Sequence, residues 1–290
     1  MHAMSPPASR TSSRTCDAGQ TLTSLGRRCP GRRAESGLMS THAGPAVTVT
    51  FAGSGDAFGS GGRYQACIHL SQAGRAPVLL DCGATSLSAL KSLGLDPGEI
   101  GAVFVSHLHG DHFGGLPFLI LDGQFTRRTG PLTVAGPPGT AARLRQAMEA
   151  MFPGSASVSR RFSLDVVELA PGGTTTVAGI EVTSWEVSHP SGAPPLALRL
   201  GIGSKTIAYT GDTAWTDDLV TAAAGADLLI AEAYYFDKAI PHHLRYADLA
   251  GHGSQLTSRR IVLTHLSADM LARRDELDFD IAHDGLTIQL

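Results

Sequence analysis

The chain has 290 residues, of which 42% are hydrophobic and 17% are charged, and its formal net charge is -3. This apolar fraction excludes disorder over the whole chain, and the length favours one large domain with appendages. The 34 glycines and 16 prolines favour many tight turns and therefore a sheet-rich fold. An aromatic content of 6% argues against binding of single-stranded nucleic acid by base stacking. No run approaches the ~18 apolar residues that a membrane span needs.

The charge is unevenly distributed along the chain. Residues 1–38 carry six arginines and two acidic residues, a net charge of +4, whereas the remaining residues carry 17 basic and 24 acidic side chains, a net charge of -7. Residues 1–44 show no apolar periodicity and are predicted to form a disordered basic tail, before one folded domain over residues 45–290. Three explanations of the tail stay open: a start codon assigned too early, with the true start near Met39, a genuine tail, or an Arg- and Ser-rich targeting segment.

The four cysteines form no CxxC pair. Cys16 and Cys29 fall in the tail, while Cys67 and Cys82 fall in predicted strands, where small buried side chains are expected. This pattern favours a reducing compartment and thus a cytoplasmic protein.

The domain begins with short apolar runs that end at turn residues. These runs predict strands over Val47–Phe51, Ala66–Leu70, Val78–Leu80, Ala102–Val105 and Leu132–Ala135. Helical patterns follow over Leu87–Leu93 and Ala141–Met151. A second series predicts strands over Val166–Leu169, Ile180–Val187, Leu196–Leu200, Thr206–Tyr209, Leu228–Ile230 and Ile261–Leu263. Further helices are expected near Trp215–Ala224 and Pro241–Ser254. Two such halves imply an α/β protein with sheets covered by helices.

One segment carries most of the chemistry. The sequence His107-Leu-His109-Gly-Asp111-His112 directly follows the predicted strand Ala102–Val105. Three imidazoles and a carboxylate within six residues at a strand end predict a metal site. This mixture of ligands suits zinc, with manganese or iron as alternatives.

The segment resembles the HxHxDH signature of the metallo-β-lactamase superfamily, and further pieces of that pattern occur in order. They are Asp81 in Leu-Leu-Asp-Cys-Gly, His189 in Val-Ser-His-Pro, Asp212 in Thr-Gly-Asp-Thr, and His265 in Leu-Thr-His-Leu. The resemblance implies a four-layer αββα sandwich with two metal ions at one edge. It places Asp81 beside the site in a structural role.

The same resemblance implies the ligands of the two ions. One ion would be bound by His107, His109 and His189. The other would be bound by Asp111, His112 and His265, with Asp212 bridging the two ions.

Within the superfamily, the chain is most similar to the ribonuclease Z branch. The similar segments are Phe51-Ala-Gly-Ser-Gly-Asp, Asp111-His-Phe-Gly-Gly-Leu-Pro, and Leu228-Leu-Ile-Ala-Glu-Ala. The branch implies a catalytic dyad in which a histidine, here His243, protonates the leaving oxygen and is paired with Glu232, while Asp111 steers the attacking hydroxide. The chain departs from the pattern here, because His243-Leu-Arg replaces His-Ser-Thr, the gap from Glu232 is short, and His242 competes for the role.

A second departure concerns the substrate. Ribonuclease Z enzymes carry a long arm that grips transfer RNA between the third histidine and the bridging aspartate, whereas only Pro190–Gly211 fill this gap here. With a net charge of -7 on the domain, binding of a polyanion is harder to explain, although the pairs Arg127-Arg128 and Arg160-Arg161 could contribute.

The expected function is therefore a phosphodiesterase that acts on small or cyclic phosphate esters. An arylsulfatase and a ribonuclease Z-type transfer-RNA processing enzyme are the alternative hydrolases. A metal-dependent binding or sensing protein is the alternative that is not an enzyme. The expected partner is a small phosphate or sulfate ester, with RNA less favoured, no membrane, and a homodimer allowed.

Overall fold

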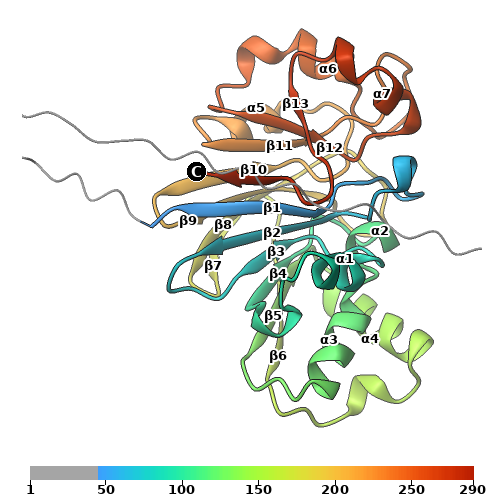
Figure 1. Ribbon diagram of the computed structural model, residues 1–290, viewed down its shortest axis with the longest axis vertical. Helices are drawn as coiled ribbons and strands as arrows, with labels where there is room; N and C mark the ends of the chain where they lie inside the picture. Colours follow the sequence, from blue (N-terminus) through green and yellow to red (C-terminus); the bar gives the residue numbers. More distant parts are fainter. Residues whose placement is uncertain (1–44) are drawn as a thin grey trace, which may run out of the picture. The chain divides into compact units, whose positions relative to one another are not determined.

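The computed structural model describes residues 45–290, so the predicted tail over residues 1–44 lies outside the described residues. Two seven-stranded sheets form the centre of this part of the chain, with helices on the outer face of each (Figure 1). None of the helices in residues 45–290 is long and apolar enough to cross a membrane.

The first sheet is built mainly from the first half of the domain. Its order is β14-β1-β2-β3-β4-β5-β6, and strands β3 to β6 run parallel. Its strands are β1 (Val47–Gly53), β2 (Cys67–Gln72), β3 (Val78–Leu80), β4 (Ala102–Phe104), β5 (Leu132–Gly136), β6 (Leu164–Glu168) and β14 (Thr287–Gln289). The associated helices are α1 (Ser86–Ser92), α2 (Gly110–Phe113), α3 (Leu116–Phe125) and α4 (Thr140–Met151).

The second sheet mirrors the first, with the order β13-β12-β11-β10-β9-β8-β7 and parallel pairing from β10 to β13. Its strands are β7 (Thr174–Val177), β8 (Ile180–Glu186), β9 (Leu196–Ile202), β10 (Lys205–Tyr209), β11 (Leu228–Glu232), β12 (Ile261–Thr264) and β13 (Asp280–Ile281). Its helices are α5 (Asp218–Ala223), α6 (Tyr246–Gly251) and α7 (Ala268–Ala272).

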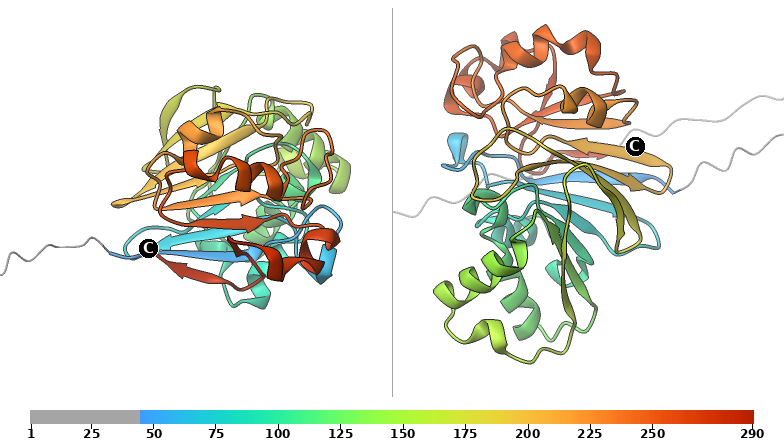
Figure 2. Two further views of the ribbon diagram at one scale, coloured as in Figure 1. Left: turned by 90° about the horizontal axis from the view of Figure 1, so that it is seen from above. Right: turned by 180° about the vertical axis from the view of Figure 1, so that it is seen from behind.

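Three hydrophobic clusters show that the four layers are packed as an αββα sandwich. The central cluster joins the inner faces of the two sheets, with Phe51 and Phe104 packed together with Leu198 and Ile230. A second cluster lies between the first sheet and helices α1, α3 and α4, and a third lies between the second sheet and helices α5 to α7. The views from above and behind show the same layering (Figure 2). The predicted fold class is confirmed.

All eleven predicted strands are present, but two helices begin later than expected. The expected helix over Trp215–Ala224 begins at Asp218, and that over Pro241–Ser254 begins at Tyr246. Arg245 has an extended backbone, and its amide and its guanidinium both donate to the Asp248 carboxylate at the start of α6. Residues Pro241–Leu244 therefore form part of the loop beside the site described below.

Candidate active site

The chemistry-bearing side chains meet where the parallel strands of both sheets end. This is the edge of an open sheet at which binding sites usually form, because the loops that leave neighbouring strands converge there. The contributing segments are Asp81 after β3, the His107–His112 segment after β4, His189 after β8, Asp212 after β10, Glu232 at the end of β11, and His265 after β12.

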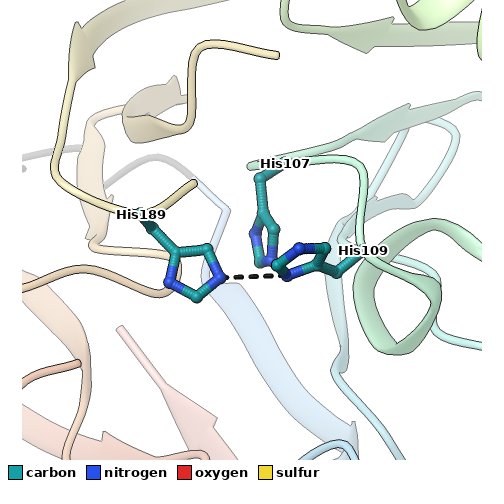
Figure 3. Close-up of side chains that lie close together, drawn as sticks. All are labelled: His107, His109 and His189. Carbon is teal, nitrogen blue, oxygen red and sulfur yellow. Dashed lines mark hydrogen bonds between the residues drawn. The ribbon is translucent and has the colours of Figure 1, made fainter. Parts of the chain in front are cut away.

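Three histidines from two segments form the first group. The structure brings His107, His109 and His189 together so that one ring nitrogen of each lies within 4.8 Å of the others (Figure 3). His189 Nε2 and His109 Nδ1 are 3.0 Å apart. Three converging imidazole nitrogens are an arrangement that could hold a divalent metal ion.

A second group of four buried residues lies beside the first. Asp111, His112, Asp212 and His265 also offer ligand atoms within 4.8 Å of one another. Asp212 lies between the two groups, because one of its oxygens is 3.2 Å from His112 Nε2 and the other is 4.0 Å from His107 Nε2. All seven residues expected as ligands are thus collected in one place.

Asp81 holds two of the histidines from behind. Its carboxylate accepts hydrogen bonds from the Ser106 backbone and hydroxyl, from the Tyr209 hydroxyl at 2.7 Å, and from His112 Nδ1 at 2.7 Å. The Ser106 hydroxyl also lies 3.1 Å from His107 Nδ1. Since Asp81 fixes the Nδ1 side of His112 directly and that of His107 through Ser106, both Nε2 atoms face the centre of the site.

Buried polar atoms without hydrogen-bond partners show that the residues present fit a metal site. Within residues 45–290, the buried atoms without a hydrogen-bond partner include His107 Nε2, His112 Nε2 and Asp212 Oδ1. Buried polar atoms normally have hydrogen-bond partners, so the convergence of these three atoms fits a site for a cation. Burial, reinforced by the neighbouring His112, lowers the pKa of His107 and keeps this imidazole neutral, the form that binds metals.

The two carboxylates of the second group are held in their charged form. Burial alone would raise the pKa of Asp111, but His112 and His265 outweigh it, so the pKa lies below the ordinary value. The same opposition lowers the pKa of Asp212, chiefly through His112 and His265. Both residues therefore present anionic oxygens to a cation.

Glu232 and His243 are in contact, although few residues separate them in the sequence. His243 Nδ1 hydrogen-bonds Glu232 Oε1, and the other oxygen of Glu232 accepts from the backbone of Thr213 at 2.8 Å. Glu232 is buried, whereas the His243 side chain is 21% exposed. Glu232 and His243 also form a cluster with Asp212 and His265. The hydrogen bond between Glu232 and His243 uses one ligand atom of each of these two residues.

His242 takes a different place from His243. Its side chain is exposed, and its backbone carbonyl accepts a hydrogen bond from His189 Nδ1 at 2.9 Å. Of the two candidates, only His243 contacts Glu232.

A clamp from the end of the chain fixes the segment that carries His265. The Asp284 carboxylate accepts from the Ser54 backbone and hydroxyl at 2.9 and 2.8 Å, and from the Tyr64 backbone at 2.8 Å. The Ser54 carbonyl in turn accepts from the backbone of His265 at 3.2 Å. The residues after β13 therefore help to position His265.

The basic pairs that could have served a polyanion are largely engaged elsewhere. Arg128 is buried and donates to the carbonyls of Gly130, Pro97, Ile100 and Pro131. Arg160 donates to the carbonyls of Val158 and Ser155. Arg128 in particular is a structural residue and is unavailable to a ligand.

Sequence reasoning missed the residues that support the ligands. Ser106 and Tyr209 complete the contacts of Asp81, and Thr213 binds Glu232, yet none of the three was assigned a role from the sequence. The one available signal was position, since Ser106 directly precedes His107 and Thr213 directly follows Asp212.

Known proteins share this architecture. Ribonuclease Z of Methanosarcina acetivorans is 26% identical over 274 residues, which cover 77% of this chain and 88% of that protein. The structure of human tRNase Z, short form, superposes with a TM-score of 0.67 and 26% identity, covering 83% of this chain and 98% of that one. The metallo-β-lactamase fold protein YhfI of Bacillus subtilis gives a TM-score of 0.69 at 20% identity, covering 85% of this chain and all of that one.

The fold and the clustered histidines and aspartates define a ribonuclease Z-like member of the metallo-β-lactamase superfamily and a metal-dependent hydrolase of ester bonds. The resemblance deduced from the sequence is thereby confirmed. Within this class, the family described as Anti-Pycsar protein Apyc1 matches residues 47–282, and the chain belongs to that family.

Proposed function

We propose that this protein is a dinuclear-metal phosphodiesterase that acts on small or cyclic phosphate esters. The observation that carries the proposal is the position of the Glu232–His243 pair beside the two ligand groups. His243 Nδ1 lies 4.0 Å from the Asp212 carboxylate that those groups share. A proton-handling pair beside a cation site matches the needs of phosphoryl transfer, which are charge neutralisation and a proton for the leaving group.

The ligands follow from the two groups. One ion would be held by His107, His109 and His189, the other by Asp111, His112 and His265, with Asp212 contributing to both. Zinc suits the five imidazoles and two carboxylates best, and manganese and iron are the alternatives. Bound there, the ions would supply Lewis acidity and offset the negative charge of a phosphodiester.

The chain's own residues would divide the proton transfers. Asp111, kept anionic by His112 and His265, orients the attacking water. The imidazolium form of His243 delivers its Nε2 proton to the leaving oxygen and becomes a neutral ring, while Glu232 holds Nδ1–H and orients the ring. This division requires His243 on the leaving-group side, which agrees with its partial exposure at the mouth of the site.

The size of the substrate is inferred from the segment between His189 and Asp212. A loop over residues 190–195, strands β9 and β10 and their tight connection use almost all of it, so the described fold carries no projecting arm there. A groove of about 340 Å³ instead opens beside His189, lined by residues 186–195 and His242. A groove of this volume fits a compact ester better than an RNA duplex.

Hydrolysis of bis(p-nitrophenyl) phosphate by metal-loaded protein tests the proposal. We expect turnover that disappears in His109→Ala, while a sulfate ester and 3′-extended transfer RNA assayed in parallel react more slowly. The exposed substitution Arg161→Ala serves as a control that should leave turnover unchanged. Fastest reaction with the sulfate ester would instead indicate an arylsulfatase. No turnover of any ester by protein of verified metal content would favour a binding or sensing role.

A ribonuclease Z-type activity is the second candidate, because the relatives named above carry that function in their names. Cleavage of 3′-extended transfer RNA at a higher kcat/KM than the small ester would favour it. The homodimer that the sequence allows and the predicted cytoplasmic location are not tested by these observations.

A further inference from the structure

The backbone at His242 adopts a conformation that side chains disfavour. Its φ is +67°, in the left-handed region, and within residues 45–290 only four other non-glycine residues share this property. Two of those four, Asp81 and His265, belong to the site already described. A left-handed backbone at a non-glycine residue costs of order 1 kcal/mol or more and persists where the surroundings impose it.

The strained turn places two groups next to the peptide that joins His242 to His243. The His242 carbonyl accepts the hydrogen bond from His189 Nδ1, and the next residue places His243 Nδ1 on Glu232. Because a carbonyl can only accept, the proton of a neutral His189 must sit on Nδ1. His189 Nε2 is then a free acceptor that points at His109 Nδ1, 3.0 Å away, and into the first ligand group (Figure 3).

We propose that the left-handed turn at His242 is a positioning device that sets the tautomer of His189 and thereby the affinity of one of the two metal ions. The main-chain carbonyl performs this role, whereas the exposed His242 imidazole is dispensable. The inference rests on the proposed dinuclear site, and it links the residue that donates a proton to a ligand of the first ion. The ion held by His107, His109 and His189 depends on the turn most directly, because the His242 carbonyl contacts His189 and no ligand of the other group.

A pair of substitutions separates the backbone from the side chain. His242→Pro fixes φ near −65° and so removes the left-handed turn, and within residues 45–290 it breaks no backbone hydrogen bond of the His242 amide. His242→Gly keeps the carbonyl and adopts the turn without strain. Ala178→Pro is the matched control, since Ala178 also has a positive φ of 49° and lies in the exposed turn between β7 and β8.

Titration of metal-free protein with Co²⁺, followed by visible absorption and calorimetry, gives the result independently of turnover. We expect two equivalents bound by the wild type, His242→Gly and Ala178→Pro. In His242→Pro, one equivalent should bind 10–100-fold more weakly while the other keeps its affinity. Two unchanged equivalents in His242→Pro would overturn the proposal, as would equal weakening of both. If none of these proteins, the wild type included, hydrolyses an ester, while His242→Pro still weakens only one of the two bound equivalents, the phosphodiesterase function alone would be overturned.

A measurement on the unaltered protein covers the case in which His242→Pro does not fold. Long-range ¹⁵N–¹H correlation spectra of the metal-free wild type should show His189 protonated at Nδ1 and unprotonated at Nε2. The opposite tautomer would rule out the role of the His242 carbonyl.

Discussion

The hydroxyl of Tyr209 donates a hydrogen bond to the carboxylate of Asp81 at 2.7 Å, and the two residues come from different sheets of the sandwich. Tyr209 ends β10, while Asp81 follows β3, and both are almost fully buried. The bond therefore joins the two halves of the protein directly beneath the histidine cluster. Asp81 in turn orients His112 and, through Ser106, His107.

Tyr209→Phe should lower the free energy of unfolding by about 1.5–3 kcal/mol, because a buried hydrogen bond to a charged group is lost. It should also weaken metal binding several-fold, since Asp81 loses one of its restraints. Urea unfolding and metal titration measure the two effects. Tyr246→Phe is the matched control: it also removes a buried hydroxyl bonded to an aspartate, Asp278, but it should leave metal binding unchanged. Equal metal affinity in wild type and Tyr209→Phe would contradict the link between Asp81 and the site.

His243→Ala should reduce phosphodiesterase kcat by about 10²-fold or more with metal content unchanged, because the leaving oxygen loses its proton donor. His242→Ala keeps the backbone carbonyl and should leave kcat within a few-fold of wild type. Steady-state kinetics with metal analysis of each variant provides the test. The reverse order of the two effects would transfer the proton donor to His242.

Neighbouring arginines at the end of α3 should respond in opposite ways. Arg128→Ala should cost about 2–4 kcal/mol of stability, because four carbonyls lose a buried charged donor. Arg127 is exposed and has a φ of 61°, so Arg127→Gly should raise stability by roughly 0.5–1 kcal/mol. Midpoints of denaturant unfolding, compared with wild type at constant m-value, measure both changes in stability. A loss on Arg127→Gly as large as that on Arg128→Ala would refute this division of roles.

The two cysteines of the described domain should resist thiol reagents. Burial raises the pKa of Cys67 to about 12, and burial together with Cys67 raises the pKa of Cys82. Both thiols stay protonated at pH 8, and the reactive species is the thiolate. In a Cys16→Ser/Cys29→Ser variant, Ellman's reagent should label neither thiol until denaturant is added. Stoichiometric labelling of the native variant within minutes would show that one of them is accessible.

The ligand residues were predictable because each is a chemically distinctive residue at the end of an apolar strand. Helix α3 was missed for the opposite reason. Its residues Leu116–Phe125 are apolar with almost no periodicity, and they bury Leu116, Leu119 and Ile120 while Phe118 and Phe125 remain exposed. A short helix of this kind cannot be separated from a loop by pattern alone.

The supporting contacts were unpredictable on different grounds. Tyr209 reads as an ordinary strand residue until the two sheets are stacked, which brings it to Asp81 from 128 positions away. The His242 carbonyl carries no sequence signal at all, because every residue has one. The sequence narrowed the proton donor to His242 or His243. The short spacing from Glu232 did not decide between them, whereas the structure of the loop before α6 did.

The clamp between Asp284 and Ser54 bears on when His265 is fixed in place as the chain is synthesised. The bond spans 230 positions, and β14 pairs with β1 at a similar separation, so the anchor for the His265 segment requires Asp284 to have been synthesised. Such distant pairings slow the search for the native topology. A nascent chain that stops before residue 284 would contain all seven clustered ligands and still lack the clamp that positions His265. We therefore expect the His265 segment to be fixed in place only after Asp284 has been synthesised and can reach Ser54.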